Sequence, residues 1–275
     1  QHGEYNVAIG QGAGDHATGS YNTFVGADAG LGGQTSAPFS SGIGMSAAGA
    51  LTTGVQNVAI GRDAMLYATT VQKVVALGYR AGYNLTTGDQ RSVYLGEDSG
   101  FYNQTGTYNT YVGYRSGFGA SGNSNSYNVG LGYYSLRDIT TGTLNVALGY
   151  LAGQGLTTGT ENVVIGGSAG TSLGDVDDAV LIGRLAGTSL NNSSADGTIA
   201  IGFESGRYLT TASGNTIIGY RAARSGVSDI HSAVIVGYEA MYSNTDSSGN
   251  VAIGHFALRQ AAGGSNRNYN VAIGQ

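Results

Sequence analysis

The sequence predicts an all-β fold: a parallel β-solenoid of about sixteen coils, each 17–18 residues long. A pentapeptide close to Asn-Val-Ala-Ile-Gly recurs along the chain, and the residues before its glycine alternate as in a short strand. No stretch shows the 3.6-residue apolar spacing of a helix. Successive glycines are never fewer than 16 or more than 20 residues apart. These column glycines are Gly10, Gly26, Gly44, Gly61, Gly78, Gly96, Gly113, Gly132, Gly149, Gly166, Gly183, Gly202, Gly219, Gly237, Gly254 and Gly274.

Each coil is predicted to contain one three-residue strand that ends directly before its column glycine. The last strand residue is a branched aliphatic in all sixteen coils, and the first is Val, Ile, Thr or Ser. This alternation is typical of a strand, and we expect both outer side chains to face a core. The predicted strands are residues 7–9, 23–25, 41–43, 58–60, 75–77, 93–95, 110–112, 129–131, 146–148, 163–165, 180–182, 199–201, 216–218, 234–236, 251–253 and 271–273.

The middle residue of each strand then points the opposite way, toward the surface of a single stack of coils. None of the sixteen middle residues carries a charge or an amide. A strand that is apolar on both faces is buried on both, so we expect these residues to lie in a subunit interface, which we favour, or against another layer of the same coil. The alternative is that the small middle residues only keep the turn compact. The interface candidates are Tyr94, Tyr111, Leu181, Ile217 and Ile235.

The rest of each coil carries bend and turn signals. The third residue after the column glycine is Ala or Ser in all fifteen coils that extend that far, which indicates close approach of the backbone. Thr-Thr-Gly, as in residues 52–54 and 157–159, is typical turn chemistry. Each coil therefore reads as a strand, a tight bend, a second short segment and a polar turn.

Asparagine precedes the column glycine by four residues in ten of the sixteen coils. When coils stack in register, an amide in such a column can donate to and accept from its neighbours, so we predict a structural ladder. Tyrosines before the asparagine and after the glycine predict aromatic stacking, with a sticky receptor-binding face as the alternative. The ladder asparagines are Asn6, Asn22, Asn57, Asn109, Asn128, Asn145, Asn162, Asn215, Asn250 and Asn270.

Charges alternate in sign at the second residue after the column glycine. In-register stacking places these side chains next to one another, where opposite charges attract, so we predict a charge ladder on the solvent side of the bend. Its members are Asp63, Arg80, Asp98, Arg115, Glu204, Arg221 and Glu239.

Composition excludes several classes of protein. Charged residues make up 11% of the chain, the net charge is −5, and no basic patch stands out, which argues against nucleic acid and anionic membrane as partners. No apolar run approaches the length of a membrane span. Cysteine is absent, which removes disulfides and thiolate sites. The chain is expected to be a single repeat array over residues 1–275 and, because its two ends read alike, a segment of a longer fibre or a subunit stacked end to end.

The repeats at residues 57–61, 250–254 and 269–274 resemble the head repeats of trimeric autotransporter adhesins of the YadA type. Residues 78–82, Gly-Tyr-Arg-Ala-Gly, are similar to repeats of phage tail-fibre-like proteins. The resemblance covers essentially the whole chain and implies a left-handed parallel β-roll assembled as a homotrimer. The adhesin unit is shorter, about fourteen residues, and this chain shows no coiled-coil heptads for a stalk.

Residues suited to catalysis or metal binding are sparse. Asp175, Asp177 and Asp178 form the densest acidic cluster, which we interpret as a solvated loop, with calcium as the alternative. The histidines His2, His16, His231 and His255 show no metal-ligand spacing. We therefore predict no catalytic residues, no cofactor and no metal.

Two function hypotheses follow from the sequence. The first is a non-enzymatic extracellular structural or adhesive fibre that associates with itself and can bind a glycan or protein receptor. The second is an ice- or polysaccharide-binding β-solenoid that uses Thr-Thr and Tyr ladders as a flat face. An ice-binding face needs threonine at the same place in almost every coil, whereas Thr-Thr-Gly occurs in only some coils here.

Overall fold

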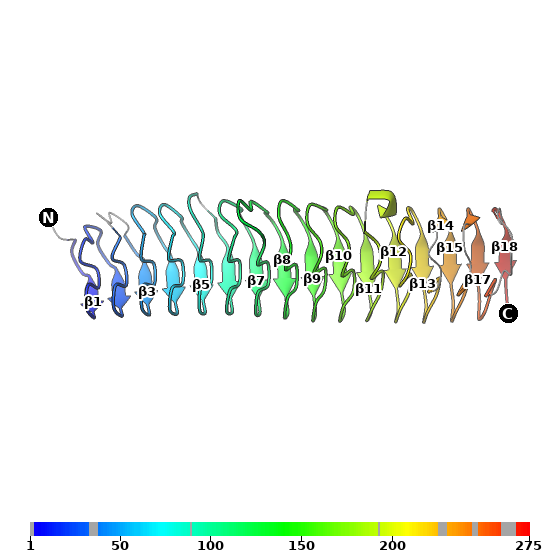
Figure 1. The fold of residues 1–275 in the computed structure, drawn as a ribbon, viewed down its shortest axis with the longest axis horizontal. Helices are drawn as coiled ribbons and strands as arrows, with labels where there is room; N and C mark the ends of the chain where they lie inside the picture. The colour runs from blue at the N-terminus through cyan, green and yellow to red at the C-terminus, as the bar shows by residue number, and fades with distance from the viewer. Residues whose placement is uncertain are drawn as a thin grey trace. The chain divides into compact units, whose positions relative to one another are not determined.

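The computed structural model describes residues 3–32, 38–88, 90–191, 193–224, 230–243, 247–259 and 268–275. The chain forms two compact units, residues 1–141 and 142–275, and each is built from the same repeat. The predicted all-β parallel solenoid is confirmed, because every strand pairing in both units is parallel (Figure 1). The one helical element of the described residues is a single 3₁₀ turn, η1 (Ser193–Ala195).

The described residues of the first unit contain eight strands of three residues, each at the predicted position. Adjacent strands pair first residue to first residue, as in Val58↔Val75, so each coil lies in register on the one before it. The strands are β1 (Val7–Ile9), β2 (Thr23–Val25), β3 (Ser41–Ile43), β4 (Val58–Ile60), β5 (Val75–Leu77), β6 (Val93–Leu95), β7 (Thr110–Val112) and β8 (Val129–Leu131).

The second unit repeats this arrangement and adds one small parallel pair. Strands β14 (Ile230–His231) and β16 (Ser247–Ser248) pair with each other, outside the main ladder. The ladder strands are β9 (Val146–Leu148), β10 (Val163–Ile165), β11 (Val180–Ile182), β12 (Ile199–Ile201), β13 (Thr216–Ile218), β15 (Val234–Val236), β17 (Val251–Ile253) and β18 (Val271–Ile273).

The column glycines close the strands where coils come closest. Gly166 has φ of +128°, and a Cβ added there would lie 2.7 Å from the carbonyl carbon and oxygen of Gly183. Its own N–H donates to Leu148 O at 2.9 Å. Both the backbone conformation and the space exclude any larger residue, which explains why glycine recurs at this place.

The predicted facing of the strands is wrong. In all ladder strands but the end strands β1 and β18, the middle residue is buried inside the coil, whereas the first and third residues lie at the surface and are half-buried or exposed. Neighbouring middle residues fit one another in size: the ring of Phe24 occupies the space left by Gly42, and the ring of Tyr111 the space left by Gly130. The core of a coil is therefore built from its middle strand residues.

Two further columns complete this core. The small residues three after the column glycine are buried, as at Ala64 and Ala169, and let the bend lie close to the strand. A third column, seven residues after the glycine, supplies large aliphatic side chains in some coils, which the strand pattern does not predict. Its members are Leu51, Leu85 and Ile139 in the first unit and Leu156, Leu173, Leu190 and Leu209 in the second.

Candidate functional site

The outer strand residues form an apolar surface on each unit, which we call the strand face. Its side chains are Val, Ile, Leu, Thr and Ser, and no charged residue occurs at an outer strand position. Ile218 is 37% exposed, whereas its neighbour Ile217 is fully buried. The most exposed aliphatic members are Val7, Ile9, Ile43, Val75, Leu77 and Leu131 in the first unit, and Ile218, Val234, Val271 and Ile273 in the second.

Stacked aromatic rings border the strand face on both sides. Before the strands, Tyr108 and Tyr127 stack with ring centroids 4.9 Å apart. After the column glycines, Tyr220 stacks on Tyr238 at 5.0 Å. These four tyrosines are 38–51% exposed, so they widen the strand face with amphipathic side chains.

The five interface candidates take the second of the two expected positions, inside their own coils. The side chains of Tyr94 and Tyr111 are fully buried in the first unit, and those of Leu181, Ile217 and Ile235 in the second. They therefore pack against other layers of their own coils and are not available to a partner subunit. If subunits associate through the strands, the contact residues are their immediate neighbours in sequence.

Burial changes the chemistry of the two tyrosines. Asn103 Nδ2 donates a hydrogen bond to Tyr94 Oη at 2.9 Å, and Tyr111 Oη donates to Asn125 Oδ1 at 2.5 Å. Burial raises the pKa of Tyr94 to about 12 against the opposing effect of its hydrogen bonds, and it raises the pKa of Tyr111 well above its ordinary value. Both hydroxyls are thus neutral structural groups at physiological pH.

The asparagine column forms hydrogen bonds between coils. Asn162 donates to Asn145 Oδ1 from its backbone nitrogen at 3.0 Å and from its side-chain amide at 2.9 Å. The same amide donates to Val176 O at 2.7 Å, and Asn162 Oδ1 accepts from Ala179 N at 2.9 Å. Of the ten ladder asparagines, eight are buried; Asn6 is half-buried and Asn270 is exposed.

The charges of the first unit lie along the bend that follows the strands. Arg80 Nη2 and Arg115 Nε both donate to Asp98 Oδ2, at 2.9 and 3.1 Å. Arg80 Nε lies 2.8 Å from Oδ1, an ion-pair contact that is not aligned as a hydrogen bond. The Asp98 side chain is fully buried beneath the two partly exposed arginines, so the expected solvent position is wrong for the acid. Asp63 pairs with the exposed Arg62 of its own coil at 3.2 Å.

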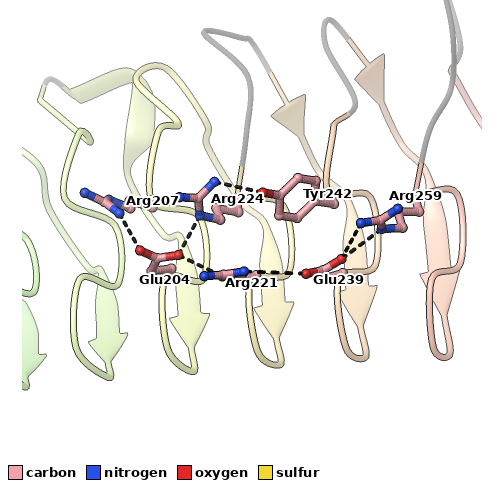
Figure 2. Close-up of polar contacts among 7 residues, drawn as sticks. All are labelled: Glu204, Arg207, Arg221, Arg224, Glu239, Tyr242 and Arg259. Atoms are coloured by element: carbon pink, nitrogen blue, oxygen red, sulfur yellow. Dashed lines mark hydrogen bonds and ion pairs between the residues drawn. The ribbon is translucent and has the colours of Figure 1, made fainter.

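The charges of the second unit form a denser group, shown in Figure 2, which we call the basic cluster. Its residues lie on the bends that follow β12, β13, β15 and β17, and they gather four arginines around two glutamates. The sequence-based statement that no basic patch exists is therefore wrong for this unit, because stacking brings together arginines that are far apart in the sequence. The members are Glu204, Arg207, Arg221, Arg224, Glu239, Tyr242 and Arg259.

The threonines of the polar turns are also engaged in coil stacking. The hydroxyls of Thr52 and Thr69 donate to the carbonyls of Thr69 and Thr86 at 2.9 and 2.7 Å, and Thr157 donates to Gly174 O at 3.0 Å. These hydroxyl protons are used in hydrogen bonds between coils and are not available to ice, which argues against an ice-binding threonine face.

The acidic loop and the described histidines are not grouped into a site. Asp177 Oδ1 accepts hydrogen bonds from the backbone and the hydroxyl of Thr160, at 2.6 and 3.1 Å. In the parts of the chain that the structure describes, no three His, Cys, Asp or Glu residues are grouped to hold a metal ion. His2 lies outside the described residues.

A hollow in the first unit is not lined by a group of residues typical of a catalytic site. It measures about 220 Å³ and is mainly apolar, with Asp28 as the one acid in its lining. Its lining residues are Asp28, Leu31, Ser46, Gly49, Ala50, Leu66 and Tyr67. Within the described ranges, no helix is long and apolar enough to cross a membrane.

No family model matches this chain, and no significant match is found among curated proteins or among solved structures. The surfaces described above are therefore the basis for a functional proposal.

Proposed function

We propose that this chain is a non-enzymatic structural or adhesive element of an extracellular fibre, and that its copies associate through the strand face as a homotrimer. The observation that carries the proposal is the strand face itself. An uncharged, mainly aliphatic surface repeated over eight successive strands in each unit is a surface that water disfavours and that an identical copy can cover.

The size of the face supports association. Strands stack about 4.8 Å apart, so eight strands span about 34 Å, and with a width of about 10 Å each unit presents about 350 Å². The largest apolar patch on a typical monomer measures about 300–600 Å² and is often functional, so a face of this size suits an interaction site. The bordering tyrosine ladders add area that suits a protein or glycan contact. Three copies and an extracellular location are implied by the resemblance to adhesin and tail-fibre repeats.

A structural role is also supported by how the chain uses its buried acids. Arginines of neighbouring coils form ion pairs with Asp98, Glu204 and Glu239. The charges of these acids therefore stabilise the stacking of coils. A general acid or base needs a proton in reach of a substrate, and these carboxylates lie beneath the guanidinium groups that neutralise them.

The experiment is to measure the mass of the purified chain by light scattering, together with two neighbouring substitutions. Wild type is expected at three times the 27.8 kDa of one chain. The double variant Ile218→Asp/Val234→Asp places charges on the strand face and should yield folded monomers, whereas Ile217→Asp should unfold the coil because its side chain is buried.

Ser172→Asp, an exposed position on another part of a coil, is the control and should keep the wild-type mass. A wild-type chain that remains a monomer at about 100 μM would overturn the trimer, since a working interface holds together at this concentration.

A further inference from the structure

The basic cluster of the second unit occupies two columns of successive coils. The second residue after the column glycine is Glu204, Arg221, Glu239 and then Phe256. The fifth residue is Arg207, Arg224, Tyr242 and then Arg259. Figure 2 shows the two columns side by side, with the acids in one and most of the arginines in the other.

Glu204 is the centre of one half of the cluster. Arg207 Nη1 donates to its Oε1, while Arg221 Nε and Arg224 Nε donate to its Oε2 at 3.0 and 2.5 Å. Burial alone raises the pKa of Glu204, but the hydrogen bonds and charges of these arginines outweigh it and hold the pKa below its ordinary value. The acid is therefore ionised and shared by three cations.

Glu239 is the centre of the other half. Arg259 Nε and Nη2 both lie 2.8 Å from its Oε2, and Arg221 Nη1 lies 3.8 Å from its Oε1. Arg221 thus pairs with both glutamates and joins the two halves, and Arg224 Nη1 donates to Tyr242 Oη at 2.9 Å. Four positive charges thus surround two negative ones, and the cluster carries an excess of two positive charges.

The glutamates are buried and the arginines reach solvent. The two carboxylate side chains are 6–7% exposed, whereas those of the four arginines are 20–39% exposed. Water and anions that approach this surface therefore meet guanidinium groups. Each guanidinium has five N–H donors. The four arginines together therefore offer more donors than the two buried carboxylates can accept.

Aromatic rings support the arginines from the side. The guanidinium carbon of Arg207 lies 4.8 Å from the centre of the Tyr208 ring, and that of Arg259 lies 4.6 Å from the centre of the Phe256 ring. A guanidinium that stacks on a ring uses its face for that contact and keeps its N–H edge for hydrogen bonds to an anion.

The first unit shows that coils can stack without an excess of positive charge on the bend. Its ladder Asp63, Arg80, Asp98 and Arg115 is balanced in charge. In the three coils of Arg80, Asp98 and Arg115 the fifth residue after the column glycine is aromatic, and these residues, Tyr83, Phe101 and Phe118, stack in sequence with centroids 4.8 and 5.1 Å apart. The second unit has Arg207 and Arg224 at the positions that correspond to Phe101 and Phe118.

We propose that the basic cluster binds an acidic polysaccharide through carboxylate or sulfate groups spaced along the coils. Arg207 and Arg224 lie on adjacent coils, about 4.8 Å apart along the stack, so they can contact neighbouring acidic groups of one linear chain. Arg259 extends the contact by two coils. This inference goes beyond the fibre proposal and does not depend on trimer formation.

A polysaccharide fits this surface better than a nucleic acid does. Nucleic-acid binding relies on neutralising many phosphates, and this chain has a net charge of −5 with a local excess of only two. The neighbouring rings Phe203, Tyr220 and Tyr238 stack on one another, so their faces are not open to bases.

The test measures binding of a size-defined heparin oligosaccharide and of polygalacturonate to the whole chain by calorimetry at about 50 mM salt. Arg207→Gln/Arg259→Gln removes the excess charge and leaves each glutamate at least one arginine. Its affinity should fall about tenfold, and the salt dependence of binding should weaken by about two charges. Glu239→Gln increases the excess of positive charge in the basic cluster, so the affinity for the polysaccharide should rise severalfold. A purely structural role of the cluster does not predict a rise.

The matched control is Arg62→Gln/Arg137→Gln, which removes the same total charge from arginines of the first unit that pair with their neighbours Asp63 and Asp138. Its affinity should stay within about twofold of wild type. The circular dichroism spectrum and mass of each variant show whether it is folded.

Three results would overturn the proposal: no binding of either polysaccharide by wild type, an equal loss in the control, or tighter binding of an oligothymidylate of the same charge. Polysaccharide binding is tested by affinity and the fibre proposal by the mass of the assembly. Failure of one proposal is therefore distinguishable from failure of the other.

Discussion

Asn145 Oδ1 accepts two hydrogen bonds from Asn162, one from the backbone nitrogen and one from the side-chain amide. One buried oxygen therefore fixes both the main chain and the side chain of the next coil. Because Asn162 in turn accepts from Ala179 N, the register of one coil determines that of the next.

We predict that Asn162→Ala lowers the free energy of unfolding by about 2–4 kcal/mol, because it leaves Val176 O and Ala179 N buried without their partners. Asn162→Ser should lose about half as much. Serine occupies this column at Ser92, where its Oγ accepts from Asn109 N at 3.0 Å. Urea denaturation followed by circular dichroism measures both values, and equal losses for the two variants would contradict the ladder.

Two adjacent glycines should respond differently to alanine. Gly166→Ala places a Cβ against the Gly183 carbonyl at a φ that alanine disfavours, and it should cost at least about 3 kcal/mol. At Gly167 an added Cβ meets nothing within 4 Å, so Gly167→Ala should change stability by less than about 0.5 kcal/mol. Thermal or urea denaturation of the two variants tests this, and similar losses would show that the glycine column does not limit coil spacing.

The fully buried Asp98 should contribute more to stability than Asp63, which pairs with an exposed arginine. Asp98→Asn removes the charge that Arg80 and Arg115 share and should cost about 2–3 kcal/mol. Asp63→Asn breaks a pair whose arginine is mostly exposed and should cost less than about 0.5 kcal/mol. Denaturation at 1 M salt gives a second check, because screening weakens exposed pairs more than buried ones.

Alkaline pH should destabilise the first unit through its buried tyrosines. Tyr94 has a pKa of about 12 in the folded chain against an ordinary value of 10.0. The folded state therefore binds this proton more tightly, so the stabilisation is fully present below pH 10 and is lost as the pH rises toward 12.

Tyr94→Phe should cost about 1 kcal/mol at neutral pH, because Asn103 loses its acceptor, but the variant should lose less stability than wild type between pH 10 and 12. Urea midpoints across this pH range measure the difference. Tyr150→Phe, an exposed tyrosine, serves as the control and should retain the wild-type pH dependence.

The positions of the strands could be predicted from the sequence, because the glycine and the alternating β-branched residues fix them locally. The facing of the strands could not be predicted from apolarity, since the outer Val and Ile and the middle residue are all apolar. The complementary sizes of Phe24 with Gly42 and of Tyr111 with Gly130 carried the missing signal. Residues that vary together in size from coil to coil share a core, whereas a surface column has no such constraint.

The basic cluster could be predicted only in part. The alternation of Glu204, Arg221 and Glu239 indicated a ladder, but Arg207, Arg224 and Arg259 belong to a second column that a count of charges along the chain does not reveal. Their proximity depends on how the chain folds back after each strand, and this is seen only in the structure (Figure 2).

The parallel register has a consequence for how such a chain can change its length. Within each unit, the surface that a coil offers to the next coil has the same form as the surface that receives the previous one. Duplication or loss of one whole repeat within a unit therefore reuses existing contacts, whereas loss of a single residue from a strand would move the glycine and asparagine columns out of line. The number of coils is thus the property that this fold can alter in whole steps without redesigning any contact.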